Sequence, residues 1–173
     1  MCASILVACS PETPAPPPLP ELVLPHLQSR ATTILDVNAV ASDALDPAAL
    51  GSLLQESGFV AGSERIYLGR GRRLARVSLR VLLFASPTGA ASYLAWLRSH
   101  ASDLMGRTTQ KDPLAVPGSM VFVHEPAGCC PKETFSVLVA WRRDTRVLFL
   151  LAAGPGADPR TVAPVADELD ALV

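Results

Sequence analysis

Residues 74–106 read LARVSLRVLLFASPTGAASYLAWLRSHASDLMG, and the first half of this stretch alternates between two faces. One face is apolar throughout, at Ala75, Val77, Leu79, Val81, Leu83 and Ala85. The other face begins with polar residues and becomes apolar later, in the order Arg76, Ser78, Arg80, Leu82 and Phe84. A period of two residues is that of a β-strand. Residues 74–86 are therefore predicted to form a strand with one face on a core and its far end covered on both sides.

The second half of the stretch predicts a helix that follows this strand directly. Ser86 can cap the helix by accepting a backbone N–H bond, and Pro87 suits the first helical position, where its missing donor would be unpaired anyway. Apolar residues then recur at spacings of four and three, at Ala90, Leu94, Leu97, Ala101 and Leu104. Gly106 ends the helix because glycine adopts the left-handed conformation without a steric penalty. A strand and a helix joined this closely must pack together, so we expect a sheet that carries helices.

A cap followed by proline also opens two further helices, at Asp46-Pro47 and Asp158-Pro159. These helices are predicted at 46–58 and 158–173. The strands predicted around them are 64–68, 74–86, 120–124, 135–141 and 146–152. Residues 32–45 give a weaker pattern, in which 32–37 could be a strand and 38–45 a turn of helix. Short turns between neighbouring strands favour antiparallel pairing. We therefore predict an α+β fold, with a five-stranded, mainly antiparallel sheet and three helices packed on it, in a single domain that covers 31–173.

The composition is that of a folded, apolar domain. Hydrophobic residues make up 49% of the chain and charged residues only 18%, and the mean hydropathy is +0.30. At 173 residues the chain is long enough to bury its own core. The net charge of −1 provides no overall field that would attract nucleic acid, so no nucleic-acid partner is expected.

Residues 1–9 end in Leu6-Val7-Ala8-Cys9, a tetrapeptide that resembles the lipobox of bacterial lipoprotein precursors. The resemblance implies that Cys9 is lipidated, begins the mature chain and supplies its contact with a membrane. The apolar run before Cys9 is shorter than the ~7–15 residues of a signal peptide, and no basic region precedes it. The motif therefore either follows a start codon further upstream or is coincidental.

Proline dominates the segment that follows the tetrapeptide, since seven of the sixteen prolines lie between residues 10 and 25. Such a run favours extended polyproline II, so 10–30 is predicted to be a semi-rigid linker that contributes nothing to a core. A lipidated cysteine, a Pro-rich linker and a compact domain form the layout of many secreted lipoproteins of actinobacteria. This layout predicts an extracytoplasmic protein, anchored to the outer face of the cell membrane. The alternative is a cytoplasmic protein with a disordered N-terminus.

Arginines form the clearest candidate binding site. Six lie within sixteen residues, at Arg65, Arg70, Arg72, Arg73, Arg76 and Arg80. Guanidinium groups bind phosphate or carboxylate through two parallel hydrogen bonds, so an anionic ligand is predicted here. The residues predicted to bind it are Arg70, Arg72, Arg73 and Arg76. The competing interpretation is a solvated hairpin end whose charge is balanced by Glu56, Glu64 or Asp103.

Cys129 and Cys130 are adjacent in a predicted loop. If Cys9 is lipidated and Cys2 leaves with the leader, these two are the remaining thiols, and a vicinal disulfide between them is one hypothesis. Such a bond closes a strained ring, so two unbridged cysteines are the other interpretation. Soft-metal binding with His124 is disfavoured, because the loop has no CxxC or HxxxH spacing.

The chain contains no motif of a known catalytic centre: GxSxG, HExxH and GxxxxGK[ST] are all absent. We therefore predict neither an enzyme nor a cofactor nor a metal site.

The helix within 87–106 carries the pattern Ala90, Ala91, Tyr93 and Leu94 after an apolar strand. This pattern is similar to the small sensor-like and PsbP-like lipoprotein domains of actinobacteria, over residues 46–173. The resemblance implies an α+β module that binds a ligand or acts as a scaffold. The expected function is a lipid-anchored module of the cell envelope with an unknown ligand or protein partner. Two alternatives are a cytoplasmic adaptor with a disordered tail and an enzyme with a cleft over the sheet.

Overall fold

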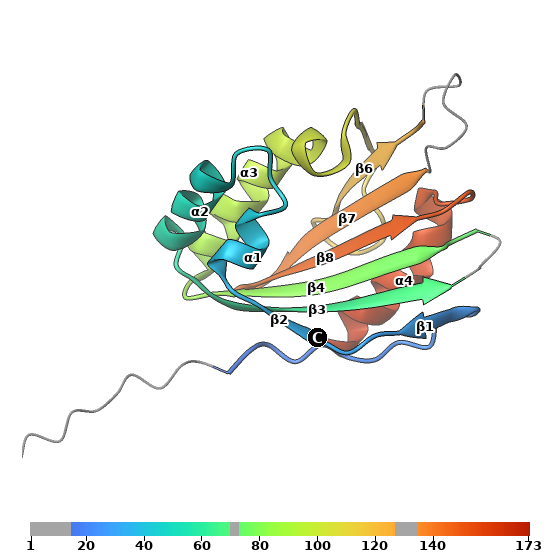
Figure 1. Cartoon of the computed structure of the whole chain (residues 1–173), viewed down its shortest axis with the longest axis horizontal. Coiled ribbons are helices and arrows are strands. Elements are labelled where there is room, and N and C mark those ends of the chain that lie inside the picture. The colour runs from blue at the N-terminus through green and yellow to red at the C-terminus, as the bar shows by residue number, and fades with distance from the viewer. Residues whose placement is uncertain (1–14, 70–72, 127–134) are drawn as a thin grey trace, which may run out of the picture.

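The computed structural model describes residues 15–69, 73–126 and 135–173, which form an antiparallel sheet with helices packed on it (Figure 1). The helices are α1 (Val37–Ala41), α2 (Pro47–Glu56), α3 (Pro87–Met105) and α4 (Pro159–Leu172). The strands are β1 (Leu27–Ser29), β2 (Thr33–Leu35), β3 (Phe59–Gly69), β4 (Arg76–Phe84), β5 (Thr109–Lys111), β6 (Met120–His124), β7 (Ser136–Arg143) and β8 (Arg146–Ala153).

The sheet runs in the order β1-β3-β4-β8-β7-β6-β5, and β2 pairs with β3 beside β1. Every pair is antiparallel. The α+β class and the antiparallel sheet are thus confirmed. β4 and β8 lie at the centre of the sheet, so the strand predicted at 74–86 is one of its two middle strands.

The predicted number of elements was wrong. In the described part of the chain the sheet has eight strands rather than five, and there are four helices rather than three. Two strands missing from the prediction, β1 and β5, are three residues long and lie at the edges of the sheet. β2 is equally short and lies within 32–37, which the sequence indicated only as a possible strand outside the five counted. Strands this short carry no alternating apolar pattern, because they are recruited by the hydrogen-bonding groups of a neighbouring strand rather than by burial of their own side chains.

The predicted helix starts are confirmed. Asp46, Ser86 and Asp158 are the N-caps of α2, α3 and α4, and each side chain accepts a hydrogen bond from a backbone N–H three residues later. Proline occupies the first turn in all three helices. These signals depend only on neighbours along the chain, which is why the sequence reveals them.

Different parts of the chain cover the two faces of the sheet. The face that carries Val77, Leu79 and Val81 packs against α4, which crosses behind β4 and β8 in Figure 1. The opposite face carries Leu82 and Phe84, each 1% exposed, and packs against α1, α2 and α3. These three helices gather at one end of the sheet, where β4 runs into α3 (Figure 1). The prediction that only the far end of this strand is covered on both sides is confirmed.

The N-terminal strap, residues 15–26, lies on the α4 side of the sheet and contributes to the core. Leu19, Leu22 and Leu24 are buried there, so residues 10–30 are not purely a linker. Two hydrogen bonds attach the strap to β3. The Ser63 hydroxyl donates to the Pro17 carbonyl at 2.6 Å, and the Leu22 N–H donates to the Tyr67 hydroxyl at 2.9 Å. A Pro-rich segment can therefore still bury its leucines when side-chain hydroxyls of a neighbouring strand satisfy its backbone groups.

We expect Tyr67→Phe to loosen the strap, because the buried Leu22 N–H loses its acceptor. An unsatisfied buried donor costs about 1–3 kcal/mol, which should appear as a lower free energy of unfolding in urea. Limited proteolysis should cut within residues 15–26 sooner than in the wild type. Tyr93→Phe is the control, since Tyr93 is a buried residue of α3, in a cluster separate from the strap. Equal cleavage rates in Tyr67→Phe and wild type would contradict this role of the hydroxyl.

Candidate functional site

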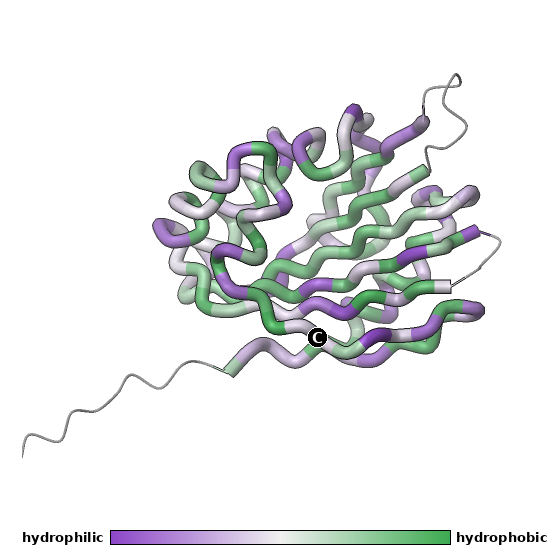
Figure 2. Tube along the Cα trace, viewed as in Figure 1, coloured by the Kyte–Doolittle hydropathy of each residue, from purple (hydrophilic) through white to green (hydrophobic). Residues whose placement is uncertain are grey.

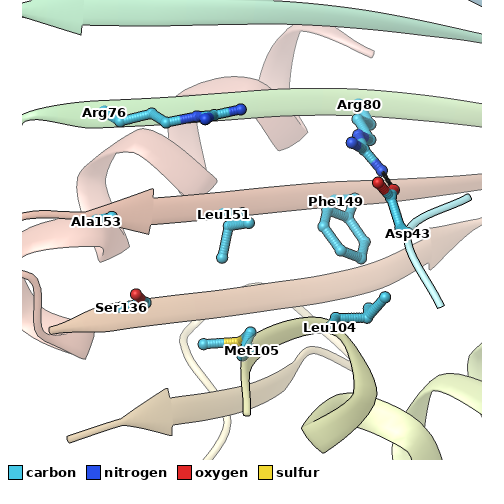
Figure 3. Close-up of a pocket in the computed structure, with 9 residues that line it drawn as sticks. All are labelled: Asp43, Arg76, Arg80, Leu104, Met105, Ser136, Phe149, Leu151 and Ala153. Carbon is cyan, nitrogen blue, oxygen red and sulfur yellow. Dashed lines mark hydrogen bonds and ion pairs between the residues drawn. The ribbon is translucent and has the colours of Figure 1, made fainter. Parts of the chain in front are cut away.

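A pocket opens on the sheet where the helical layer stops, beside the C-terminal end of α3. We call it the sheet-face pocket, and its volume is about 370 Å³. Figure 3 shows the residues that line it: Asp43, Arg76, Arg80, Leu104, Met105, Ser136, Phe149, Leu151 and Ala153. The strands supply its floor, the last turn of α3 supplies one wall, and the segment between α1 and α2 supplies Asp43.

Strand register arranges the floor of the pocket in rows. Arg76 of β4 pairs with Ala153 of β8, which pairs in turn with Ser136 of β7. Two residues further along β4, Ser78 stands opposite Leu151, and two further still, Arg80 stands opposite Phe149. Alternation along β4 therefore places its three polar residues on the helix-bearing face, as the sequence predicts. Figure 2 shows β7 and β8 as mostly hydrophobic, whereas β3 and β4 carry hydrophilic positions.

Arg80 is held by two carboxylates. Its Nε donates to Oε1 of Glu64 at 2.8 Å, and its Nη1 donates to Oδ2 of Asp43. The Ser78 hydroxyl donates to the same Glu64 oxygen at 2.6 Å. The guanidinium also lies over the Phe149 ring, 5.6 Å from its centroid. With 17% of the Arg80 side chain and 12% of the Glu64 side chain exposed, this is a largely desolvated cluster, in which one guanidinium is paired with two carboxylates.

The protonation of this cluster follows from its contacts. Burial acts to raise the pKa of Glu64, but the Ser78 hydrogen bond and the charge of Arg80 outweigh it and leave that pKa below its ordinary value. Burial acts to lower the pKa of Arg80, and the Asp43 and Glu64 carboxylates overcome this effect and raise it. Glu64 and Arg80 therefore remain charged at neutral pH.

Arg76 differs from Arg80 in its surroundings. It is exposed at the mouth of the pocket and forms no ion pair with another residue that the structure describes. In Figure 3 its side chain reaches along β4 toward Arg80. Its charge contributes to lowering the pKa of Glu64, but only as the last of several causes. Among the described residues, Arg76 is thus the guanidinium of the pocket that has no carboxylate partner.

The predicted arginine site is divided in the structure. Arg73 lines a different, largely apolar pocket of about 430 Å³, between the N-terminal strap and α4. Arg70 and Arg72 lie outside the described residues. The residue that joins Arg76 is Arg80, which the sequence prediction of the site left out. Arg80 lies four residues after Arg76 on the same strand, and residues at this spacing share a face, so the sequence pattern could have indicated Arg80 as part of the site.

Ser136 and His124 are cross-strand partners on β7 and β6, which places a hydroxyl and an imidazole on the same face of the sheet. His124 Nδ1 lies 2.9 Å from the backbone oxygen of Arg107. A backbone carbonyl orients this ring, and no described carboxylate supplies the charged third member that activates a serine nucleophile.

The described residues bring together no group of three or more His, Cys, Asp and Glu side chains that could hold a metal ion. Cys9, Cys129 and Cys130 lie outside the described ranges, so the lipidation site and the proposed vicinal disulfide stay predictions. No helix within those ranges combines the length and the apolar character needed to cross a membrane.

Comparisons with known proteins support the architecture. No family model matches the chain, and no curated protein matches it in sequence. Among solved structures, the fold is similar to that of the extracellular domain of PknH from Mycobacterium tuberculosis, with a TM-score of 0.57 and 14% sequence identity. The similarity covers 84% of this chain and 85% of that chain. This single-domain α+β architecture is thus one that an extracellular domain of an actinobacterial protein also adopts.

Proposed function

We propose that the chain is a binding module of the cell envelope, held at the outer face of the cell membrane by a lipid on Cys9. Its domain binds a ligand in the sheet-face pocket and catalyses no reaction. The observation that carries the proposal is the open sheet face beside α3, where the exposed Arg76 stands over apolar side chains. A concave site with an apolar floor and few polar groups is typical of ligand-binding pockets.

The charged groups of the pocket favour binding over catalysis. Arg80 is committed to Glu64 and Asp43, which leaves these carboxylates poor general bases. Ser136 stands beside an imidazole whose described partner is a backbone carbonyl rather than a carboxylate. An enzyme with a cleft over the sheet is therefore the weaker candidate.

The extracytoplasmic location is supported by two independent features. The tetrapeptide that ends in Cys9 resembles a lipobox, and the fold resembles that of an extracellular domain. The packed strap adds a geometric consequence. If Cys9 carries the lipid, seven residues separate it from Pro17, the first buried residue of the strap, and seven extended residues span at most about 25 Å. The domain would then be held close to the bilayer rather than on a long stalk.

We expect Cys9→Ser to move the protein out of the membrane fraction, because covalent lipid is its proposed attachment to the membrane. In the native host, mass spectrometry of the wild-type protein should show an N-terminal peptide that begins at Cys9 and carries acyl chains. Cys2→Ser is the matched control and should change neither the fractionation nor that mass. A bare Cys9 in a protein recovered from the cytosolic fraction would contradict the anchor and favour the cytoplasmic adaptor.

A further inference from the structure

We infer that the sheet-face pocket binds a monoanionic amphiphile, a small molecule with one carboxylate group on an apolar body. This inference rests on the proposed function, and it adds the chemistry of the ligand. The carboxylate would lie at Arg76 and Ser136, and the apolar body would lie along Leu151 toward Met105.

The head-group end of the pocket is defined by one row of the sheet. The backbones of Arg76 and Ser136 lie on either side of Ala153, a small residue. In Figure 3 the Arg76 side chain runs along β4 toward Arg80, so its guanidinium must turn across Ala153 to face Ser136. Two strand spacings separate their backbones, about 10 Å, a gap that the long arginine side chain can partly bridge. A guanidinium and a hydroxyl are both hydrogen-bond donors to an anion, so a carboxylate above Ala153 would meet donors on both sides.

The other end of the pocket is apolar. Leu151 and Phe149 continue the floor along β8, and Leu104 and Met105 close it from the last turn of α3. The one polar side chain of β4 in the middle row, Ser78, already donates its hydroxyl to Glu64. An apolar group is therefore the complement to this end, since a polar group would lose its water without gaining partners.

The charge balance of the pocket disfavours a ligand with more than one negative charge. The two arginines and the two carboxylates of the cluster, Asp43 and Glu64, sum to zero. A monoanion at Arg76 stays apart from the two carboxylates, which are paired with Arg80. A phosphate monoester carries a charge of about −1.5 to −2 at neutral pH. Its additional negative charge would be repelled by the carboxylates of Asp43 and Glu64. We therefore expect a carboxylate to be preferred over a phosphate.

The volume sets the size of the ligand. About 370 Å³ accommodates on the order of ten non-hydrogen atoms, when each is given the ~30 Å³ of a water molecule. A medium-length acyl chain or an aryl carboxylate has this size. Octanoate, 1-octanol, octylamine and octyl phosphate are matched probes, because they share the apolar chain and differ in the head group.

We expect octanoate, titrated into the isotopically labelled protein, to shift the backbone amide resonances of Arg76, Leu151 and Met105 and to bind more tightly than the other three probes. Arg76→Gln should weaken octanoate binding by about tenfold or more, because a charge-assisted hydrogen bond is lost, and should leave octanol binding unchanged. Arg98→Gln is the matched control, an exposed arginine on α3 outside the pocket. Ala153→Leu should block octanoate while keeping the unfolding temperature, since it fills the space between Arg76 and Ser136.

The outcomes separate the two proposals. Equal affinities for octanoate and octanol, or an unchanged octanoate affinity in Arg76→Gln, would overturn the ligand class. Binding of octylamine or octyl phosphate in the pocket in preference to octanoate would overturn the ligand class and leave the proposed binding function standing. If none of the four probes shifts the pocket resonances, the inferred ligand class is overturned, whereas the Cys9 experiment tests the proposed envelope location separately.

Discussion

Replacing Trp141 with alanine is expected to lower the free energy of unfolding by about 3–5 kcal/mol. Trp141 is fully buried on β7, where it packs in the core between the sheet and α4. Its Nε1 donates a hydrogen bond to Oδ1 of Asp170 at 2.8 Å, which ties α4 to the sheet. The substitution removes both a large apolar side chain and this bond. Since a domain is stable by only about 5–15 kcal/mol, the variant should unfold at a much lower urea concentration.

The chain contains a matched control for this experiment. Trp96 on α3 is only partly buried and stacks on His100 with ring centroids 4.8 Å apart. Trp96→Ala should therefore cost much less than Trp141→Ala, because its site can fill with water. Trp141→Phe keeps most of the volume and loses the bond to Asp170, so its cost should fall between the two. Equal losses for the two alanine variants would show that the sheet and α4 do not form the main core.

Replacing Arg80 with methionine is expected to cost about 3 kcal/mol at neutral pH. Methionine keeps an apolar stem over Phe149 but leaves Glu64 and Asp43 without their shared cation. An unpaired charge in a largely buried site is strongly destabilising, typically by ~3–5 kcal/mol. We take the low end of this range because the Asp43 side chain is 36% exposed. Arg98→Met, at an exposed position on α3, should change stability by less than about 0.5 kcal/mol.

The pH dependence identifies the cause of this loss. The pKa of Glu64 is lowered in the folded protein despite its burial, because Ser78 and Arg80 favour the carboxylate. A lowered pKa stabilises the fold above the ordinary value of 4.5, and this stabilisation disappears as the pH falls through the folded pKa. Without Arg80, the Glu64 carboxylate loses the charge that offsets its burial, and protonation relieves part of that cost. The difference between wild type and Arg80→Met should therefore shrink below about pH 4.5.

Unfolding curves in urea at neutral and acid pH test this expectation. The double variant Arg80→Met with Glu64→Gln should be more stable at neutral pH than Arg80→Met alone, since no buried charge remains at Glu64. A loss of the same size at both pH values would show that Arg80 stabilises the fold through packing and not through its charge.

The sequence predicted those parts of the site that a single strand determines. Alternation along β4 placed Arg76 and Arg80 on one face, and the Ser86 cap located the start of α3. The sequence did not predict which of the two arginines pairs with carboxylates in the described structure. Asp43 pairs with Arg80 although the two are 37 residues apart in the chain, and no local sequence pattern predicts this pairing. The predicted set of arginines therefore followed their crowding along the chain, whereas the structure assigns Arg73 and Arg76 to different pockets.

The strap shows that local sequence patterns also failed to predict a long-range contact of the fold. A Pro-rich sequence indicates extended backbone, and the strap is extended, but the prediction that it stays outside the core was wrong for Leu19, Leu22 and Leu24. Its attachment depends on Ser63 and Tyr67, each more than forty residues away in the chain.

By itself, the sequence determined the α+β class, the antiparallel sheet, the three helix starts marked by a cap and proline, and the faces of the central strand. These features follow from hydrogen bonds and side-chain periodicity between residues that are close along the chain. The tertiary structure alone decided the edge strands, the docking of the strap, the neutralisation of Arg80 and the open pocket at the end of α3. Each of these depends on contacts between segments that are distant in the sequence, and such contacts are determined by the packing of the complete fold.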